Sequence, residues 1–348
     1  SPKQLAEVLF EELGLPVHRF TKTGYSTASD ALDRLVYSHP IVRLVLRHRS
    51  LSKLISTWEA SLRRAIDPAD GRVHPSFRTT HTQSGHVVTT DPDLQRTPAR
   101  TPEMRRIREG FVAAPGHLLV GVDYSQLELR LLAHLSADPV LADLLRQHAD
   151  VHRRTASEIL GVDEARITPE QRRLGKVVNF ATFYGQGAVA LGLDLGVSTE
   201  EASTWIRRFD QFYTGARSWQ KAELQRARRV GGCTSIAGRF LRIPHLSSQA
   251  SKARTHAERL ARRLAVQASA ADLCRAALVA VDRMLAADCP GSRLVMTLHD
   301  QLLVEAPAAE AIHVGARVAA EMEAILDLHV PLVAVASCGR SWALDDER

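Results

Sequence analysis

The sequence lacks any apolar run near the ~20 residues that a membrane-spanning helix needs, and no signal-peptide pattern opens it. Its four cysteines are far apart, without the CxxC or Cys/His spacing of a zinc site. It has no internal repeat and no low-complexity tract. These absences argue against a membrane protein, a zinc module and a repeat array. We therefore expect a cytoplasmic protein with reduced thiols.

What the sequence does contain is enough chain for two or three subdomains, at 348 residues. Apolar residues make up 45% and charged residues 24%, which is typical of a globular protein. Lys and Arg outnumber Asp and Glu by 45 to 39, giving a net charge of +6 and a pI near 9.4. This excess indicates a polyanionic partner. The cations also cluster, in residues 43–53 and again in residues 254–263.

Two carboxylates follow β-type segments. An apolar run over residues 118–122 ends at Asp123, which predicts a buried strand that delivers an acid to a sheet edge. Two further runs, 294–298 and 302–306, surround Asp300 and predict a hairpin with an acid at its tip. If the strands are neighbours, the two acids could hold two Mg²⁺ ions for phosphoryl transfer. Either aspartate alone is more often a cap or turn residue.

One helix has a clear start, because Thr168-Pro169-Glu170-Gln171 combines a capping box with proline at the first helical position. We expect it to run to Tyr184 and to end at Gly185. Arg172, Lys176, Phe180 and Tyr184 are spaced by four and so share one stripe. Cations near the helix N-terminus with aromatics beyond them suit a nucleotide, phosphates first and sugar and base next. The alternative is two surface charges and two core aromatics.

Periodicity and turn residues predict the remaining elements. They are a short helix over residues 1–15 that ends at Gly14, a helix capped by Ser29 or Asp30, and a helix over 40–65 with Ile41, Leu44, Leu51, Leu54 and Ile55 inward. Strand and loop follow over 71–100, a mostly helical region to about 286, a helix over 308–326, and a last strand from Leu332 to Ser337.

Several of these segments resemble the polymerase region of family A DNA polymerases, the DNA polymerase I type. DYSQLELR (123–130) is similar to the family's motif A, RRLGKVVNFATFYG (172–185) to motif B, and LHDQ (298–301) to motif C. Other similar segments occur in the family's order: SPKQLAEVLF, TKTGYSTAS, RSLSKLISTW, DPDLQRTP and AERLARRLAVQASAAD. The resemblance covers nearly the whole chain.

The resemblance implies an α+β right-hand fold with an antiparallel-sheet palm, helical fingers and a shortened thumb. The expected parts are thumb and connecting helices (1–65), palm with motif A (66–148), fingers with motif B (149–255) and palm with motif C (256–348). It also implies a monomeric DNA polymerase that adds dNTPs to a primer on template DNA, away from membranes and near the nucleoid. We expect no proofreading or 5′ nuclease domain within these residues, and low processivity.

The resemblance also implies roles for individual residues. Asp123, Asp300 and the backbone of Tyr124 would bind two Mg²⁺ ions, for which Mn²⁺ could substitute, and Lys176 would act with the two acids in catalysis. The incoming dNTP would contact Arg172, Lys176, Phe180, Tyr184, Gln126, His152 and Arg100, with Glu128 as the gate against a 2′-hydroxyl. DNA would contact Arg49, Lys53, His86, Gln95, Arg259, Arg263, Gln267 and His299; Gln126 would also lie near the duplex.

Some positions depart from the family's pattern. Gln301 replaces the usual acid after the motif C aspartate, which predicts weaker or altered metal binding. His86 replaces an arginine, and Asp93, Arg96 and Arg263 replace asparagines that hydrogen-bond the minor groove. We therefore hypothesise relaxed fidelity, against the alternative that neighbouring residues compensate. A catalytically silent DNA-binding protein and a single-subunit RNA polymerase are the other functions considered; the retained acids argue against the first and Glu128 against the second.

Overall fold

The computed structural model describes residues 1–17, 19–21, 24–98 and 101–344, and it divides into two compact units. The first unit consists of residues 1–76 and 91–107, and the second of residues 77–90 and 108 onward. Each unit buries apolar side chains of its own.

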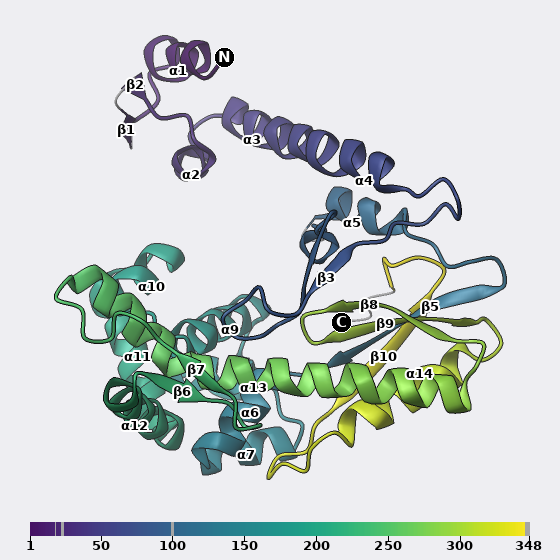
Figure 1. Cartoon of the computed structure of the whole chain (residues 1–348). Coiled ribbons are helices and arrows are strands. Elements are labelled where there is room, and N and C mark those ends of the chain that lie inside the picture. Colours follow the sequence, from purple (N-terminus) through teal and green to yellow (C-terminus); the bar gives the residue numbers. More distant parts are fainter. Residues whose placement is uncertain (18, 22–23, 99–100, 345–348) are drawn as a thin grey trace. The chain divides into compact units, whose positions relative to one another are not determined.

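The first unit is largely helical (Figure 1). Its elements are α1 (Pro2–Ala6), a π-helical turn (Glu7–Glu12), β1 (Phe20–Thr21), β2 (Gly24–Tyr25), α2 (Ser29–Leu32), a 3₁₀ turn (Asp33–Leu35), α3 (Pro40–Lys53), a second π-helical turn (Leu54–Glu59), α4 (Ala60–Ala65) and a 3₁₀ turn (Leu94–Arg96). The predicted helices over residues 1–15 and 40–65 are confirmed. Gly14 follows the first with φ of 61°, a conformation that glycine adopts without strain.

The predicted inward face of the helix over residues 40–65 is partly wrong. Leu44 and Ile55 are 64% and 60% exposed, whereas Val42 is fully buried. Val42 belongs to the small core of this unit, with Ile41, Val45 and Leu46 packed against it. Apolar residues occur on more than one side of this helix, so its sequence alone did not identify the buried stripe.

The predicted cap of the next helix is also wrong. Ser29 is the first residue of α2, Ala28 is its N-cap, and no side chain caps it. Asp30 instead forms an ion pair with Arg19, 2.7 Å between Arg19 Nη1 and Asp30 Oδ2.

The second unit contains a four-stranded antiparallel sheet in the order β10-β5-β9-β8 (Figure 1). Its strands are β5 (His117–Tyr124), β8 (Arg293–Leu298), β9 (Gln301–Pro307) and β10 (Ala334–Gly339). The buried strand before Asp123 and the hairpin around Asp300 are thus confirmed. The last strand begins two residues later than predicted, because the carbonyls of Pro331 and Val333 accept hydrogen bonds from Arg130 and Ser125.

The helical elements of this unit are α6 (Leu127–Ser136), α7 (Pro139–Arg146), α8 (Val151–Leu160), a 3₁₀ turn (Glu164–Arg166), α9 (Pro169–Phe183), α10 (Ala188–Leu195), α11 (Thr199–Phe212), α12 (Thr214–Val230), α13 (Ser251–Asp288) and α14 (Ala311–Glu323). The helices α13 and α14 pack on the four-stranded sheet, and the other helices of the unit pack mainly on one another. α5 (Pro102–Glu109) and β3 (Ser76–Arg78) cross the unit boundaries, and β3 pairs with β4 (Val88–Thr90). A hairpin of β6 (Gly232–Thr234) and β7 (Phe240–Arg242) interrupts the region predicted to be mostly helical.

The long helix α13 packs against α6, α12, α14 and β8. By length and composition it could cross a membrane, but 61% of its apolar 18-residue window is buried inside the protein. This burial is typical of the core helix of a globular protein.

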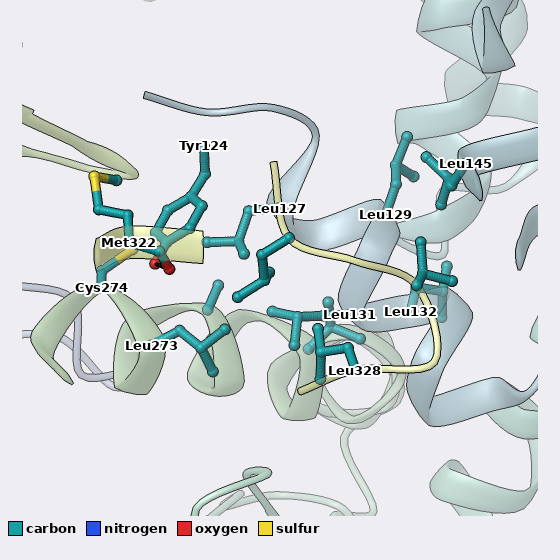
Figure 2. Close-up of a cluster of buried hydrophobic side chains, with 14 of the residues drawn as sticks. Tyr124, Leu127, Leu129, Leu131, Leu132, Leu145, Leu273, Cys274, Met322 and Leu328 are labelled. Atoms are coloured by element: carbon teal, nitrogen blue, oxygen red, sulfur yellow. Dashed lines mark hydrogen bonds between the residues drawn. The ribbon is translucent and has the colours of Figure 1, made fainter. Parts of the chain in front are cut away.

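The core between α6, α13 and α14 anchors the segment after Asp123 (Figure 2). Tyr124 is 2% exposed, and its hydroxyl donates to the carbonyl of Met322 at 2.7 Å. Arg130, 3% exposed, donates to the carbonyls of Ser125 (2.8 Å) and Pro331 (2.7 Å). These buried donors fix the turn that leaves β5, because an unpaired buried donor would be costly.

Candidate active site

Strand register brings the two predicted acids to the same end of the neighbouring strands β5 and β9, which is the sheet edge predicted above. Asp123 on β5 lies directly opposite Gln301 on β9. Leu298 pairs with Gln301, so His299 and Asp300 form the two-residue turn of the β8–β9 hairpin. The backbone N–H of Tyr124 donates to the carbonyl of Asp300 at 3.1 Å. Strand pairing and this backbone hydrogen bond therefore hold Asp123 and Asp300 near each other.

The thiol of Cys274, on α13, is affected by the negative charges of both acids. Burial raises the pKa of this thiol, and the charges of Asp300 and Asp123 raise it further. Both acids therefore lie close enough to Cys274 for their charges to act on its thiol. The carboxylates of Asp123 and Asp300 and the backbone carbonyl of Tyr124 are hard oxygen donors, which fit Mg²⁺ or Mn²⁺. Gln301 projects from the same face as Asp123 and offers an amide oxygen without a third charge.

Helix α9 begins and ends as its sequence predicts. The Thr168 hydroxyl accepts from the Gln171 backbone N–H at 3.2 Å, and the Gln171 side chain accepts from the Thr168 N–H at 2.9 Å. Tyr184 is the C-cap, and Gly185 follows with φ of 75°. Within the helix, a Cβ on Gly175 would lie 2.1 Å from the carbonyl oxygen of His152. Glycine at this position therefore allows α9 to approach α8 closely.

A cavity of about 490 Å³ in the second unit collects many of the predicted site residues. Its lining includes His86, Gln126, Glu128, His152, Phe180, Tyr184, Gln267, His299 and Asp300, together with Cys274. These residues come from α6, α8, α9 and α13 with their caps, from the β8–β9 turn and, for His86, from the loop between β3 and β4. Phe180 and Tyr184 are half-buried and line this cavity, so they are not sealed core aromatics.

Contacts between aromatic rings and a hydrogen bond shape one side of this cavity. The ring centroids of Phe180 and Tyr184 are 5.9 Å apart, and those of His152 and Phe180 are 5.8 Å apart, with the rings tilted in both pairs. The Tyr184 hydroxyl donates to Glu128. Burial raises the pKa of Glu128, while this hydrogen bond and the positive charge of Arg263 oppose the rise. The arrangement holds a carboxylate of α6 against the C-terminal end of α9.

A second cavity, of about 660 Å³, lies between α9, α10 and α13. Its lining carries four cationic side chains beside the Phe180 and Tyr184 rings, namely Arg173, Lys176, Arg259 and Arg263. The Arg263 guanidinium carbon lies 5.8 Å from the centre of the Tyr184 ring. Cations beside flat apolar rings suit a strand with phosphates and bases.

The sequence pattern that defines DNA polymerase family A matches residues 1–344. The chain belongs to this family. It is 42% identical over 344 residues to the thermostable DNA polymerase I of Thermus filiformis and 40% identical over 344 residues to DNA polymerase I of Deinococcus radiodurans. These matches cover 98% of this chain but 41% and 36% of those relatives. The chain thus spans less than half the length of these curated relatives.

A solved family A structure is similar as well. The POL domain of Pol1 from M. smegmatis, in complex with a DNA primer-template and dNTP, matches with a TM-score of 0.91 and 36% identity. The match covers 99% of this chain and 61% of that chain. The predicted α+β polymerase fold is thereby confirmed.

Three of the predicted DNA-contacting residues, Arg49, Lys53 and Gln95, lie in the first unit. Arg49 donates to the Thr27 carbonyl and, at 3.4 Å, to its hydroxyl. Lys53 is exposed on α3, and Gln95 is buried in the 3₁₀ turn Leu94–Arg96. Arg100 lies outside the described residues. The roles assigned to these residues stay predictions.

The cation at the start of α9 has an intramolecular partner that the motif did not indicate. Arg172 forms a close ion pair with Asp150, the residue that caps α8. Burial opposes ionisation of Asp150, but hydrogen bonds with Arg172 and the Arg153 backbone lower its pKa overall. Arg172 therefore links the N-terminal ends of α8 and α9.

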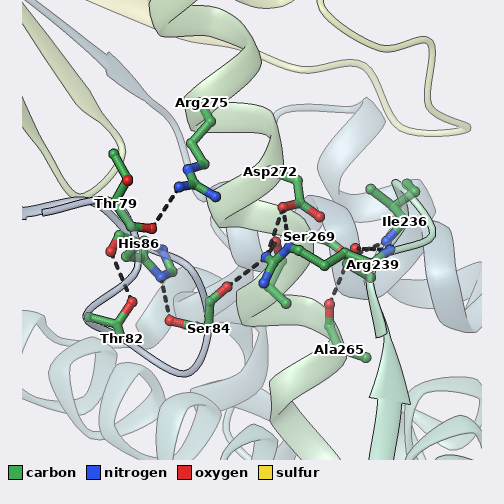
Figure 3. A network of polar contacts seen from close by, with 12 residues as sticks. Thr79, Thr82, Ser84, His86, Ile236, Arg239, Ala265, Ser269, Asp272 and Arg275 are labelled. Atoms are coloured by element: carbon green, nitrogen blue, oxygen red, sulfur yellow. Dashed lines mark hydrogen bonds and ion pairs between the residues drawn. The ribbon is translucent and has the colours of Figure 1, made fainter. Parts of the chain in front are cut away.

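The family motifs also did not identify a clamp that holds His86 (Figure 3). Arg239 donates to the carbonyl of Ser84 at 2.7 Å and pairs with Asp272 of α13 at 2.7 Å. The Ser84 hydroxyl lies 2.8 Å from His86 Nδ1, and Arg275 of α13 donates to the Thr79 carbonyl at 2.6 Å. The loop that carries His86 is thus tied to α13. Arg239 is 155 residues from Ser84 in sequence, which is why local patterns miss it.

Proposed function

We propose that this chain is a template-directed DNA polymerase that adds deoxynucleotides to a primer 3′-hydroxyl by two-metal phosphoryl transfer. The observation that carries the proposal is the convergence of Asp123 and Asp300 at one sheet edge, with Asp300 lining the cavity that Glu128 and Tyr184 share. The M. smegmatis relative, described as a complex with primer-template and dNTP, supports the same substrates. A cytoplasmic, nucleoid-associated monomer stays a prediction.

The metal ions would be held by Asp123, Asp300 and the carbonyl of Tyr124. When bound there, they would activate the 3′-hydroxyl and stabilise the leaving pyrophosphate. Lys176 and Arg172 would bind the triphosphate through charge-assisted hydrogen bonds, with His152, Arg100 and Gln126 as further contacts. Because Arg172 also pairs with Asp150, triphosphate binding would compete with that ion pair.

Glu128 would select deoxyribose. Its carboxylate is bound by the Tyr184 hydroxyl and faces the 490 Å³ cavity, where it would occupy the space of a 2′-hydroxyl. Phe180 and Tyr184 would stack on the nucleotide. The duplex would contact Arg49, Lys53, His86, Gln95, Arg259, Arg263, Gln267 and His299, and the palm, fingers and thumb would follow the boundaries predicted above.

The decisive experiment is primer extension with one dNTP at a time, comparing Mg²⁺ with Mn²⁺ and dNTPs with rNTPs. We expect template-directed incorporation of dNTPs that requires a divalent ion, and Glu128→Ala should increase rNTP incorporation relative to dNTP. A chain that binds primer-template without incorporating any nucleotide would be a silent DNA-binding protein. Preference for rNTPs in the unaltered chain would instead indicate an RNA polymerase.

We also propose that checking of the primer-terminal pair is relaxed. Arg263 lies over Tyr184 and His86 is held by Ser84, so both side chains have intramolecular partners where the family has minor-groove contacts. Arg263→Asn together with His86→Arg, which restore the family's residues, should lower mismatch extension about tenfold, as expected for one or two regained hydrogen bonds. Equal mismatch extension before and after the change would contradict the proposal. Extension of matched ends is the control.

A further inference from the structure

Behind His152 lies a buried polar network that the proposed chemistry does not use. It consists of Asn179 of α9, Thr155 of α8 and Tyr213 between α11 and α12, all 1% exposed or less. Asn179 Nδ2 lies 2.8 Å from His152 Nδ1, and Asn179 Oδ1 lies 2.9 Å from the Thr155 hydroxyl. The Tyr213 hydroxyl is 2.9 Å from the same Thr155 oxygen. The four side chains form one continuous chain.

The hydrogens in this chain can be arranged in two ways. In the first, Tyr213 donates to Thr155, Thr155 donates to Asn179 Oδ1, and the Asn179 amide donates to His152 Nδ1. In the second, Thr155 donates to the carbonyl of Val151, 2.8 Å away, and the Asn179 amide is reversed. A neutral imidazole then carries its hydrogen on Nε2 in the first arrangement and on Nδ1 in the second.

His152 is neutral in this setting. Burial is the main cause that lowers the pKa of His152 to about 4, and the positive charges of Lys176 and Arg172 also lower it. Its ring is 5% exposed and lines the 490 Å³ cavity. Within the described part of the chain, Nδ1 has the Asn179 partner and no residue bonds Nε2. The ring edge with Nε2 is therefore the polar edge that can meet a ligand.

We propose that Asn179 is a positioning residue: supported by Thr155 and Tyr213, its amide occupies His152 Nδ1, so that the ring presents Nε2–H as a neutral donor to a phosphate oxygen of the incoming nucleotide. The inference rests on the proposed function for its ligand. Its logic is that a bare Nε2 lone pair would repel an anion, whereas an N–H attracts it. A neutral donor adds direction without adding a third cation beside Arg172 and Lys176.

The first test is the tautomer itself, read by NMR of the protein with ¹⁵N-labelled histidine, with His152→Gln to assign the signal. We expect Nε2 to be protonated and Nδ1 to be the unprotonated acceptor, and Asn179→Ala, which removes the donor to Nδ1, to increase the other tautomer. A ring protonated on Nδ1 in the unaltered protein would overturn the inference. This readout does not require activity, so it stands apart from failure of the proposed polymerase function.

The second test is a double-mutant cycle on single-nucleotide incorporation. Asn179→Ala should raise the dNTP KM about five- to tenfold, the loss of roughly one hydrogen bond, with kcat within about twofold. In a His152→Ala background the same change should have no further effect. Thr182→Val is the control, because Thr182 is buried on the same helix and its hydroxyl has no partner among the described residues. Additive effects of the Asn179 and His152 changes would overturn the inference, and absence of any incorporation by the unaltered protein would overturn the proposed function instead.

Discussion

The sheet edge with Asp123 and Asp300 and the helix pair α8–α9 are positioned by different means. At the sheet edge, strand register and a two-residue turn place the acids, so the backbone determines the geometry. In the helix pair, side chains determine it: the Asp150–Arg172 ion pair, the Asn179–His152 contact and the close approach at Gly175. Loss of one side chain should therefore affect the chemistry most at the sheet edge and the packing most at the helix pair.

The largest effect is expected at the sheet edge. Asp123→Asn removes one of two charges that would hold the metal ions but leaves the strand intact, so incorporation should fall by about 10³-fold or more with little change in stability. Single-turnover dNTP incorporation and urea unfolding measure the two quantities. Asp282→Asn, the same change at an exposed position of α13, should alter neither. Full activity of Asp123→Asn would remove the basis of the two-metal proposal.

The opposite pattern is expected in the helix pair. Gly175→Ala puts a Cβ 2.1 Å from the His152 carbonyl oxygen and 2.9 Å from the Ala156 nitrogen, both backbone atoms. The helices must separate, which should lower the free energy of unfolding by about 1–3 kcal/mol in excess of the gain in helix propensity. Urea unfolding measures it. Gly187→Ala is the control for the added methyl group, because nothing lies within 4 Å of its Cβ, although Gly187 is the N-cap of α10 and not a residue inside a helix. Equal effects of the two changes would show that close packing at Gly175 is unimportant.

The sequence could predict the sheet edge better than the helix pair, and the reason is physical. Continuous apolar runs and a short turn are local signals, and they predicted the strands that bring Asp123 and Asp300 together. The capping box and Gly185 likewise predicted both ends of α9. In contrast, the Thr155–Tyr213 contact joins residues 58 positions apart, and no local pattern encodes it. The exposed Leu44 and Ile55 are a related case, because hydrophobicity alone does not indicate which side of a helix meets the core.

The smallest expected effect sharpens the account of the sheet edge. Gln301 lies opposite Asp123, and its amide Nε2 would be 3.3 Å from a Cβ on Gly121, so the side chain lies along the same face of the sheet. Gln301→Glu adds a negative charge there without a change of size. The Mg²⁺ concentration for half-maximal incorporation should fall about threefold, the effect of one partly screened charge.

The same added charge should lower the melting temperature in the absence of divalent ions, because three carboxylates then repel one another. Magnesium should restore it, since a bound cation stabilises only the folded state. Gln225→Glu, the same substitution at an exposed position of α12, should change neither the magnesium dependence nor the melting temperature. If Gln301→Glu also leaves the magnesium dependence unchanged, the side chain opposite Asp123 does not face the metal ions. The replacement of the family's acid by Gln301 would then not alter metal binding. A fall in both quantities would support a position of residue 301 beside the metal ions, as its register opposite Asp123 predicts.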